Sequence, residues 1–386
     1  MKSLREIVES SPQMSALTMR TLREEDSPTP LGPARWDWQK VRRVLVIRLR
    51  SIGDTVLATP SLVALKRFLP HAQVDILLED WVAPVLDDFA FVDDVITLTR
   101  GSAISRARTA KQIREARYDV VYNLHGGTTA TLLTRLSGAT NRVGYSTYQY
   151  ARLHNHQAPP SSLLWGREKT HSVEQQLGLL GWTGIPVSDR PPTQLTVTEQ
   201  AAASISHKLL AEGLDETPFA VIHPTAAFDT KQWATDKFAR VAENLSDRAL
   251  PVIVITAPAE AHVAETLKEA SSRRVTALTN LSLPEVTALT SRARLFVGND
   301  SGIAHIAAAV GAPSVVIFGS SNTAHWRPWA KVAAEVVLEE MECQPCHGYY
   351  CEEFEEPECI KRVPVERVVA AIDRVLRETN RAGTVE

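Results

Sequence analysis

The feature that most constrains this fold is an alternation of strand-like and helix-like segments that runs along the chain twice. The strand-like segments are short and rich in β-branched residues, and helical patterns separate most of them: VRRVLVIRLR, VDILLED, DDVITLT and YDVVYNL in the first run, then FAVIHP, PVIVIT, ARLFVGND and PSVVIFG in the second. Strands that alternate with helices of this length form βαβ units, in which the strands are parallel. The pattern therefore predicts an α/β protein with parallel sheets.

A proline-rich joint separates the two runs, because Gly184-Ile185-Pro186 is followed closely by Arg190-Pro191-Pro192. At about 150 residues per domain, a chain of 386 residues has room for two or three domains. We predict two Rossmann-like domains that face a cleft. The expected boundaries are a disordered leader at 1–40, a first domain at 41–186, a second at 187–363, and a C-terminal helix and tail at 364–386 that packs back on the first domain.

The charge balance and the apolar stretches of the sequence limit the partners and the location that we expect for this protein. Lys and Arg number 42 against 45 Asp and Glu, a formal net charge of −3, whereas proteins that bind nucleic acid in bulk usually carry a basic excess. The longest largely apolar stretch, 306–318, is shorter than the ~20 residues of a membrane span. The N-terminus lacks the apolar region of a signal peptide. We expect a cytoplasmic protein with no transmembrane segment and no nucleic-acid partner.

Four cysteines form a local feature near the C-terminus, with the spacing C-x2-C-x4-C-x7-C: Cys343, Cys346, Cys351 and Cys359. Four cysteines in a chain of this length are too few for a disulfide framework. With His347 adjacent they could bind zinc, but the spacing is not that of a standard zinc finger. We expect buried thiols or a stabilising loop, and no metal site.

Ligands of open parallel sheets bind beyond the carboxyl ends of the strands, so the residues that follow strands are the informative ones. The G-x-G-x-x-G and G-x-x-x-x-G-K-[ST] signatures are both missing. Instead, a strand runs into a helix through Asp300-Ser301-Gly302, with His305 one turn further on. Free N–H groups at such a helix start suit a phosphate. The alternative is an ordinary capped helix with a packed histidine.

Two further loops of the second domain carry polar residues at strand ends. Thr225 and Lys231 follow FAVIH, and a lysine there can contact a phosphate as a point charge. Glu260 follows the next strand and could accept hydrogen bonds from a ribose or a base. The alternatives are an exposed loop lysine and a glutamate that favours a helix N-terminus.

The first domain offers Asp54, in the loop after its first strand, as a general base or as a helix cap. Thr59-Pro60 would make a good helix start, which would leave Asp54 free in the loop. Basic residues surround it in the sequence, among them Arg48, Arg50 and Lys66. Arg48 interrupts an apolar strand, which indicates a functional position.

These motifs resemble those of glycosyltransferase family 9, the heptosyltransferases. The N-terminal match is Arg48-Leu49-Arg50-Ser51-Ile52-Gly53-Asp54 with Pro60 and Leu62. The C-terminal match is Asn299-Asp300-Ser301-Gly302 with His305, Pro313 and Phe318-Gly319. Between them lie Arg142-Val143-Gly144-Tyr145, His171-Ser172-Val173-Glu174 and Lys231-Gln232-Trp233. The resemblance covers about residues 41–376.

The resemblance implies a GT-B architecture and inverting transfer of a heptose from ADP-L-glycero-D-manno-heptose to a lipopolysaccharide inner-core sugar. It implies no cofactor, and an acceptor that is linked to lipid at the cytoplasmic face of the inner membrane. The roles it implies are Asp54 as general base, Lys231 as the diphosphate counter-ion, the donor-binding residues Thr225, Glu260, Asp300, Ser301, Gly302 and His305, and the acceptor-binding residues Arg48, Arg50 and Lys66.

Two loops depart from the family pattern. Ala226 and Ala227 stand where some members have hydroxyl side chains, and His125-Gly126 stands where Gln-Gly is common. These departures leave open a family member with a different nucleotide-sugar donor. A separate alternative is a sugar-nucleotide epimerase, because such enzymes share a similar two-domain fold.

Overall fold

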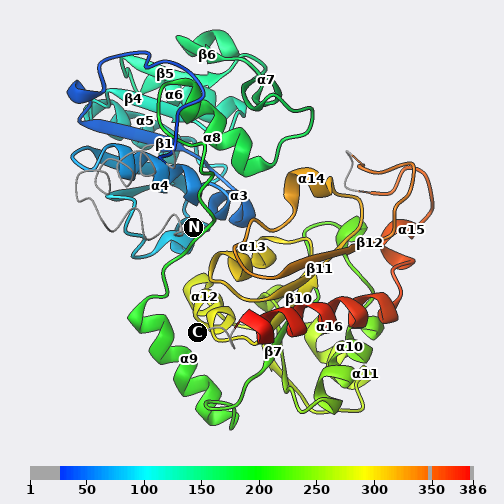
Figure 1. The fold of residues 1–386 in the computed structure, drawn as a ribbon. Coiled ribbons are helices and arrows are strands. Elements are labelled where there is room, and N and C mark those ends of the chain that lie inside the picture. The colour runs from blue at the N-terminus through cyan, green and yellow to red at the C-terminus, as the bar shows by residue number, and fades with distance from the viewer. Residues whose placement is uncertain (1–26, 347–349, 383–386) are drawn as a thin grey trace, which may run out of the picture.

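The computed structural model describes residues 27–346 and 350–382, so the expected leader falls outside it for residues 1–26. Within this part of the chain there are two halves, each built on a parallel six-stranded sheet with helices on both faces (Figure 1). The strand orders are β3-β2-β1-β4-β5-β6 and β12-β11-β10-β7-β8-β9. The predicted α/β class with two Rossmann-like units is confirmed.

The first half carries the following elements: β1 (Arg43–Ile47), α3 (Ile52–Val56), α4 (Thr59–Phe68), β2 (Gln73–Glu79), β3 (Asp94–Leu98), α5 (Ala103–Glu115), β4 (Val120–Asn123), α6 (Thr128–Leu136), β5 (Asn141–Tyr145), β6 (His156–Ala158), α7 (Ser161–Trp165) and α8 (Ser172–Trp182). Short 3-10 turns lie at Trp38–Lys40, Ala83–Leu86 and Ala151–Leu153.

The second half carries these elements: α9 (Glu199–Ala211), β7 (Ala220–His223), α10 (Thr235–Asp247), β8 (Val252–Ile255), α11 (Ala261–Ala270), β9 (Val275–Leu278), α12 (Leu283–Ser291), β10 (Leu295–Asn299), α13 (Gly302–Ala309), β11 (Ser314–Phe318), α14 (Thr323–Trp326), β12 (Ala334–Leu338), α15 (Glu358–Lys361) and α16 (Val365–Ala382). Its 3-10 turns are Asp229–Lys231 and Pro258–Glu260.

The central strands are continuous apolar runs because both of their faces are covered. In β1, Val44 and Val46 point into one core with α4 and α8, while Leu45 and Ile47 point into another with Ile113 of α5. Buried parallel strands require such runs rather than an alternation of apolar and polar residues. The register places Val46 beside Ile76 of β2 on one side and Tyr122 of β4 on the other. From β1 the sheet grows to one side through β2 and β3, and then to the other side through β4, β5 and β6. Open sheets bind ligands beyond the strand ends at such a switch point, which here lies between β1 and β4.

The described end of the expected leader is ordered on the first half. Leu31 donates its backbone N–H to Gly181 O at 3.0 Å, and the Trp38 indole donates to Thr183 O at 3.2 Å. Trp38 is buried in the core of that half. The prediction of a disordered leader is therefore wrong for residues 27–40, where tryptophans supply an apolar anchor to the end of α8.

The final helix α16 packs against α10, β11 and β12 of the second half, and not on the first domain as expected (Figure 1). Its apolar stripe, including Val368, Ile372 and Val375, joins the core of the second half. The sequence shows an amphipathic helix but does not show which apolar surface it covers.

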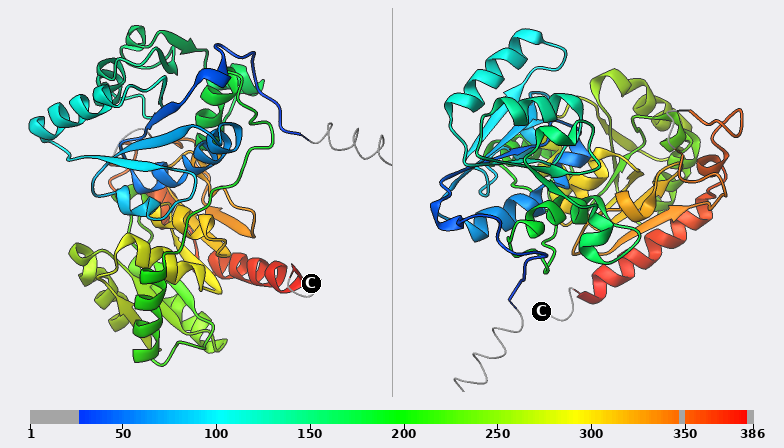
Figure 2. Two further views of the ribbon diagram at one scale, coloured as in Figure 1. Left: turned by 90° about the vertical axis from the view of Figure 1, so that its left-hand side faces the viewer. Right: turned by 90° about the horizontal axis from the view of Figure 1, so that it is seen from above.

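Contacts between the halves come from segments distant in sequence (Figure 2). His325 Nδ1 lies 2.9 Å from Thr170 O, and His171 Nε2 lies 2.8 Å from Arg327 O. The helices α3 and α13 meet directly. Among the described residues, no helix is long and apolar enough to cross a membrane.

Candidate active site

A cavity of about 580 Å³ lies between the halves, beyond the carboxyl ends of both central strands, and this volume lies within the range of small-ligand sites. The first half contributes Ser51, Ile52, Gly53, Asp54 and Trp81 to its walls. The second half contributes the polar residues His223, Thr225, Lys231, Thr256, Glu260, Asp300, Ser301 and His305, and the apolar or small residues Ala226, Ala227, Phe228, Ile255, Ala257, Leu281, Leu283, Val286, Gly302, Ile303 and Trp326.

Glycines let the two halves approach closely at this cavity. A Cβ added to Gly53 would lie 2.7 Å from Cδ2 of His305, and one added to Gly302 would lie 2.7 Å from Cβ of Ile52. The N-termini of α3 and α13 therefore meet across the cleft, which explains why glycine occupies both predicted motifs.

Asp54 is both a helix-capping residue and a cleft-facing carboxylate. It stands in the first turn of α3, where its Oδ2 accepts hydrogen bonds from Ser51 N at 3.1 Å and Ser51 Oγ at 3.3 Å. Its other oxygen forms an ion pair with Arg48. Arg48 also donates to Leu124 O at 3.0 Å, so the guanidinium is fixed behind the carboxylate. The two sequence interpretations of Asp54 are thus compatible with each other.

Lys231 and Asp300 form the charged centre of the second half. Lys231 Nζ lies 2.8 Å from Asp300 Oδ2, and Ser321 Oγ donates to the same oxygen at 2.5 Å. Asp300 is 5% exposed and the Lys231 side chain 20%. Among the described residues that line the cavity, Lys231 is the only Lys or Arg.

Asn299, beside Asp300 in the motif, has a structural role. Its side chain accepts from Trp233 N at 3.1 Å and donates to Pro224 O at 2.7 Å, and it is fully buried. Through these two hydrogen bonds, Asn299 at the end of β10 holds the loop that contains Thr225 and Lys231 in place.

Thr225, Glu260 and Ser301 surround a buried histidine. The Thr225 hydroxyl donates to Glu260 Oε2 at 2.8 Å, and it lies 3.3 Å from His223 Nε2. Ser301 Oγ lies 3.3 Å from Nδ1 of the same ring. His223 was not among the predicted site residues, although its place at the end of β7 is the signal that could have identified it.

The histidines at the cleft are neutral at pH 7. Burial lowers the pKa of His223 to about 4. Burial, and then the positive charge of Arg48, lowers the pKa of His125 to about 4. Burial also lowers the pKa of His305. The positive charge of Lys231 adds to this shift, whereas the negative charges of Asp300 and Asp54 oppose it. These rings can donate or accept hydrogen bonds, and the lowered pKa values disfavour their charged forms.

None of the three predicted acceptor-binding residues, Arg48, Arg50 and Lys66, lines the cavity. Lys66 lies in the last turn of α4, where its Nζ pairs with Asp93 at 2.5 Å and donates to Ala72 O at 3.0 Å. Ala72 precedes β2, so Lys66 sits at the edge of the sheet opposite to the cleft. Arg50 is exposed beside the cavity, and Arg48 acts through Asp54.

The cysteine-bearing segment supports the loop after β11. Cys346 N donates to Ser320 O at 2.9 Å, and Gln344 Nε2 donates to Gly319 O at 2.6 Å. The adjacent Ser321 contacts Asp300, so the segment supports the loop that carries this contact. Cys343, Cys346, Cys351 and Cys359 are free thiols. In residues 27–346 and 350–382, no group of three or more His, Cys, Asp or Glu side chains is arranged to hold a metal ion.

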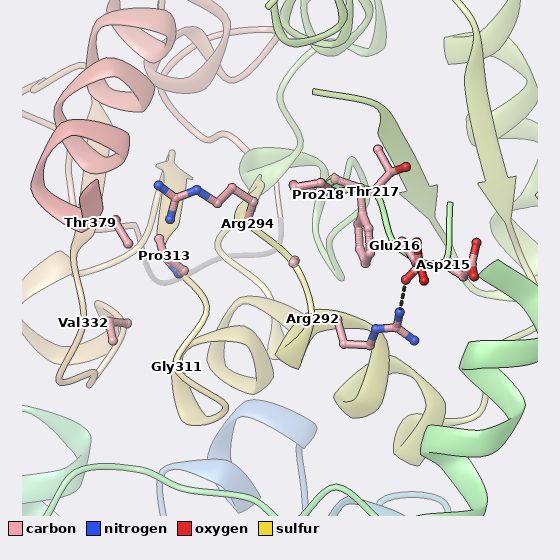
Figure 3. Close-up of a pocket in the computed structure, with 12 residues that line it drawn as sticks. Asp215, Glu216, Thr217, Pro218, Arg292, Arg294, Gly311, Pro313, Val332 and Thr379 are labelled. Carbon is pink, nitrogen blue, oxygen red and sulfur yellow. Dashed lines mark hydrogen bonds between the residues drawn. The ribbon is translucent and has the colours of Figure 1, made fainter. Parts of the chain in front are cut away.

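A second cavity, of about 440 Å³, lies at the amino ends of the second sheet (Figure 3). Arg292 and Arg294 border it, but both already have partners. Arg292 donates a hydrogen bond to Asp215 O at 2.6 Å, and Arg294 donates one to Asn380 Oδ1. Because it lies at the opposite strand ends from Lys231 and Asp300, it is separate from the candidate active site.

Comparisons with known proteins agree with this geometry. The sequence pattern of glycosyltransferase family 9 (heptosyltransferase) matches residues 106–355. The chain is 28% identical over 345 residues to lipopolysaccharide heptosyltransferase 3 of Escherichia coli K12, covering 86% of this chain and 97% of that protein. It is 23% identical over 366 residues to lipopolysaccharide heptosyltransferase 1 of Pseudomonas aeruginosa, covering 86% and 98%.

Solved structures show the same fold. The family 9 glycosyltransferase of Veillonella parvula superposes with a TM-score of 0.78 at 19% identity, over 90% of this chain and all of that one. The E. coli heptosyltransferase WaaC with ADP gives 0.66 at 20% identity, over 86% and 99%. The predicted GT-B architecture is confirmed.

Proposed function

Since the chain belongs to glycosyltransferase family 9, we propose that it transfers a heptose from an ADP-linked heptose to a sugar of the lipopolysaccharide inner core. The observation that carries the proposal is that a carboxylate of one half, Asp54, faces a lysine and a helix N-terminus of the other half across a single cavity. The relatives' names and the neighbours solved with ADP and with an ADP-heptose analogue support the choice of donor.

The second half suits a nucleoside diphosphate sugar. The N-terminus of α13, with the amides near Ser301 and Gly302, offers N–H groups to a phosphate, and Lys231 offers a cation. The apolar wall, with Leu281, Leu283 and Val286, suits a nucleobase.

Polar groups of the same half would orient the rest of the donor. Glu260, already an acceptor for Thr225, would bind a ribose hydroxyl. Asp300 would hold sugar hydroxyls, and His305 would lie by the donor phosphates. These assignments extend the roles that the family resemblance implies.

In the proposed reaction, an acceptor hydroxyl gives its proton to Asp54 as its oxygen attacks the anomeric carbon from the face opposite the diphosphate. The bond from that carbon to the phosphate oxygen breaks, and ADP leaves with the electron pair. Arg48 pairs with Asp54 and fixes the orientation of its carboxylate, and Lys231 and the amides of α13 would face the growing negative charge. We propose that this single displacement inverts the anomeric centre and needs no cofactor.

The acceptor is proposed to be a lipid-linked saccharide at the cytoplasmic face of the inner membrane. It would enter from the first half, where Trp81, 45% exposed, borders the cavity and offers an aromatic face to a sugar ring.

The test is the initial rate of heptosyl transfer by Asp54→Asn. Asparagine caps a helix about as well as aspartate but takes no proton, so transfer should slow by about 10²–10⁴-fold while the Kd for ADP stays near its parental value. Glu285→Gln is the matched control, because Glu285 also occupies the third position of a capping box with a cationic partner, Lys208, and does not line the cavity. Near-parental transfer by Asp54→Asn would refute the general-base role.

A panel of nucleotide sugars separates the proposed donor from the alternatives. Faster transfer from another nucleotide sugar would overturn the choice of heptose. Conversion of a donor in the absence of acceptor would indicate an epimerase.

A further inference from the structure

Basic residues concentrate on one helix and its surroundings in the first half. Residues 100–117 contain six Lys or Arg and one acidic residue, Glu115, whereas the whole chain has a net charge of −3. Arg106 and Arg108 have no ion-pair partner among the described residues, and both are exposed. The helix α5 that carries them lies on the outside of the first half (Figure 2).

Exposed apolar side chains share a face with these cations. On α5, Ile104, Arg108 and Lys111 recur at the spacing of one helix face, opposite the buried Thr109 and Ile113. Ile104 is 75% exposed, which is unusual for isoleucine on a helix that has a buried side available.

The neighbouring helix α6 continues the same surface. Its outward residues Leu132, Arg135 and Leu136 are exposed, and Leu132 and Leu136 are 47% and 49% exposed. Arg114 of α5 reaches Leu136 O at 3.4 Å, so the two helices lie side by side. We call the outward residues of both helices the α5–α6 face: Ile104, Arg108, Lys111, Leu132, Arg135 and Leu136.

We propose that the α5–α6 face docks the protein on a bilayer that contains anionic phospholipid. Alternating Arg or Lys with exposed Ile and Leu fits a lipid surface, where cations meet phosphates and apolar side chains enter the boundary of the acyl chains. A nucleic acid would use the cations but would leave the three apolar side chains without a favourable contact. Since the whole chain has a net charge of −3, the cations of residues 100–117 are a local excess.

The position of the face fits the catalytic geometry. Both helices follow parallel strands, so they begin at the carboxyl edge of the first sheet, the edge that borders the cavity. A bilayer against the α5–α6 face would lie beside the cavity mouth and leave it open. The inference deepens the proposed function, which supplies the lipid-linked acceptor, but binding to vesicles depends on neither donor nor acceptor.

The test is flotation of the full chain with vesicles of phosphatidylcholine alone and of phosphatidylcholine mixed with phosphatidylglycerol. Binding should require phosphatidylglycerol and should fall as salt screens the charges. Arg108→Glu with Lys111→Glu should lower the partition coefficient by at least about 25-fold, at roughly 5-fold for each of the two cations lost. Ile104→Ser with Leu136→Ser should lower it as well, and that response distinguishes insertion from simple charge attraction.

The matched controls lie on the second half. Lys268→Glu with Arg377→Glu removes two exposed cations of α11 and α16, and Leu210→Ser removes a side chain of α9 that is 62% exposed. These controls should bind vesicles as the parent does. Equal binding by parent and charge-reversed protein, or no binding by the parent, overturns the proposal. The proposal is also overturned if the Ile104→Ser with Leu136→Ser protein binds vesicles normally while added RNA displaces the parent protein from vesicles. That result would assign the α5–α6 face to nucleic acid.

Transfer to a delipidated acceptor should be parental in every one of these variants. If no transfer occurs even in the parent while vesicle binding follows the expected pattern, the proposed function fails and the docking face stands.

Discussion

The close approach of α3 and α13 makes the cleft sensitive to one methyl group at Gly53. Its Cβ would lie 2.7 Å from Cδ2 of His305, whereas carbon atoms in contact lie about 3.5–4.0 Å apart. The His305 ring is 5% exposed and packed, so it has little room to turn away. Since the two groups belong to different halves, Gly53→Ala should relieve the overlap by moving the halves apart by about 1 Å.

This displacement should slow transfer by about 10–100-fold, because a shift of ~1 Å between reacting groups can cost about 10²-fold in rate. The Kd for ADP should change little, since its proposed ligands all belong to the second half. Stability should fall only modestly: overpacking costs about 1–3 kcal/mol, and alanine recovers up to about 1 kcal/mol as a helix former.

The assay compares initial transfer rates with the Kd for ADP from calorimetry, for Gly53→Ala and for Gly213→Ala. Gly213 has a φ of +70° and open space around its missing Cβ, so alanine there strains the backbone without touching the cleft. The Gly213 variant should lose stability but keep its rate. A Gly53→Ala protein that transfers at the parental rate would refute the argument that contact between these helices sets the geometry of the cleft.

Two further predictions concern the second half. Lys231→Ala should abolish most of the stabilisation by ADP, which for the parent is about 2.7 kcal/mol at 100 times Kd, as measured by thermal shift; an undiminished shift would remove Lys231 from the phosphate site. The same variant should lower the unliganded stability by about 3 kcal/mol or less, because Asp300 loses its cation, and chemical denaturation measures this loss. His223 has a folded-state pKa of about 4, below its unfolded value of about 6.5, so the stability it contributes is complete above pH 6.5 and is lost as the pH falls toward 4. His223→Gln should therefore reduce the difference in unfolding free energy between pH 7 and pH 5 by about 2 kcal/mol, and an unchanged difference would contradict the buried neutral ring.

Sequence reasoning identified most central strands because their burial on both faces leaves continuous β-branched runs. It did not identify β5, β6, β9 or β12 as strands. β12 lies at the edge of the second sheet and is mostly half-buried, so its sequence is less uniformly apolar. The predicted packing of α16 on the first domain was wrong for a related reason. An amphipathic stripe shows that a helix packs against an apolar surface, but it does not show which surface that is.

The candidate site was predictable where residues follow strands directly. Asp54, Asp300, Ser301 and Lys231 meet in one cavity because the carboxyl ends of parallel strands share an edge. Lys66 is near them in sequence, but it lies about two turns into α4, which runs from Thr59 toward the other edge of the sheet. Ser321 was missed because its contact with Asp300 depends on the path of the loop after β11, which no local pattern encodes.

In the reaction that we propose, the charges in the cavity explain how a single lysine would assist departure of a diphosphate. The described lining holds three carboxylates, Asp54, Glu260 and Asp300, against Lys231 alone, so a bound diphosphate does not meet a free cation. It must share Lys231 with Asp300, and the share it takes grows as negative charge accumulates on the departing phosphate oxygen. An interaction that strengthens along the reaction lowers the barrier more than one that is already complete in the ground state. In the proposed reaction, the pairing of Lys231 with Asp300 at 2.8 Å would therefore favour catalysis over tight binding of the donor.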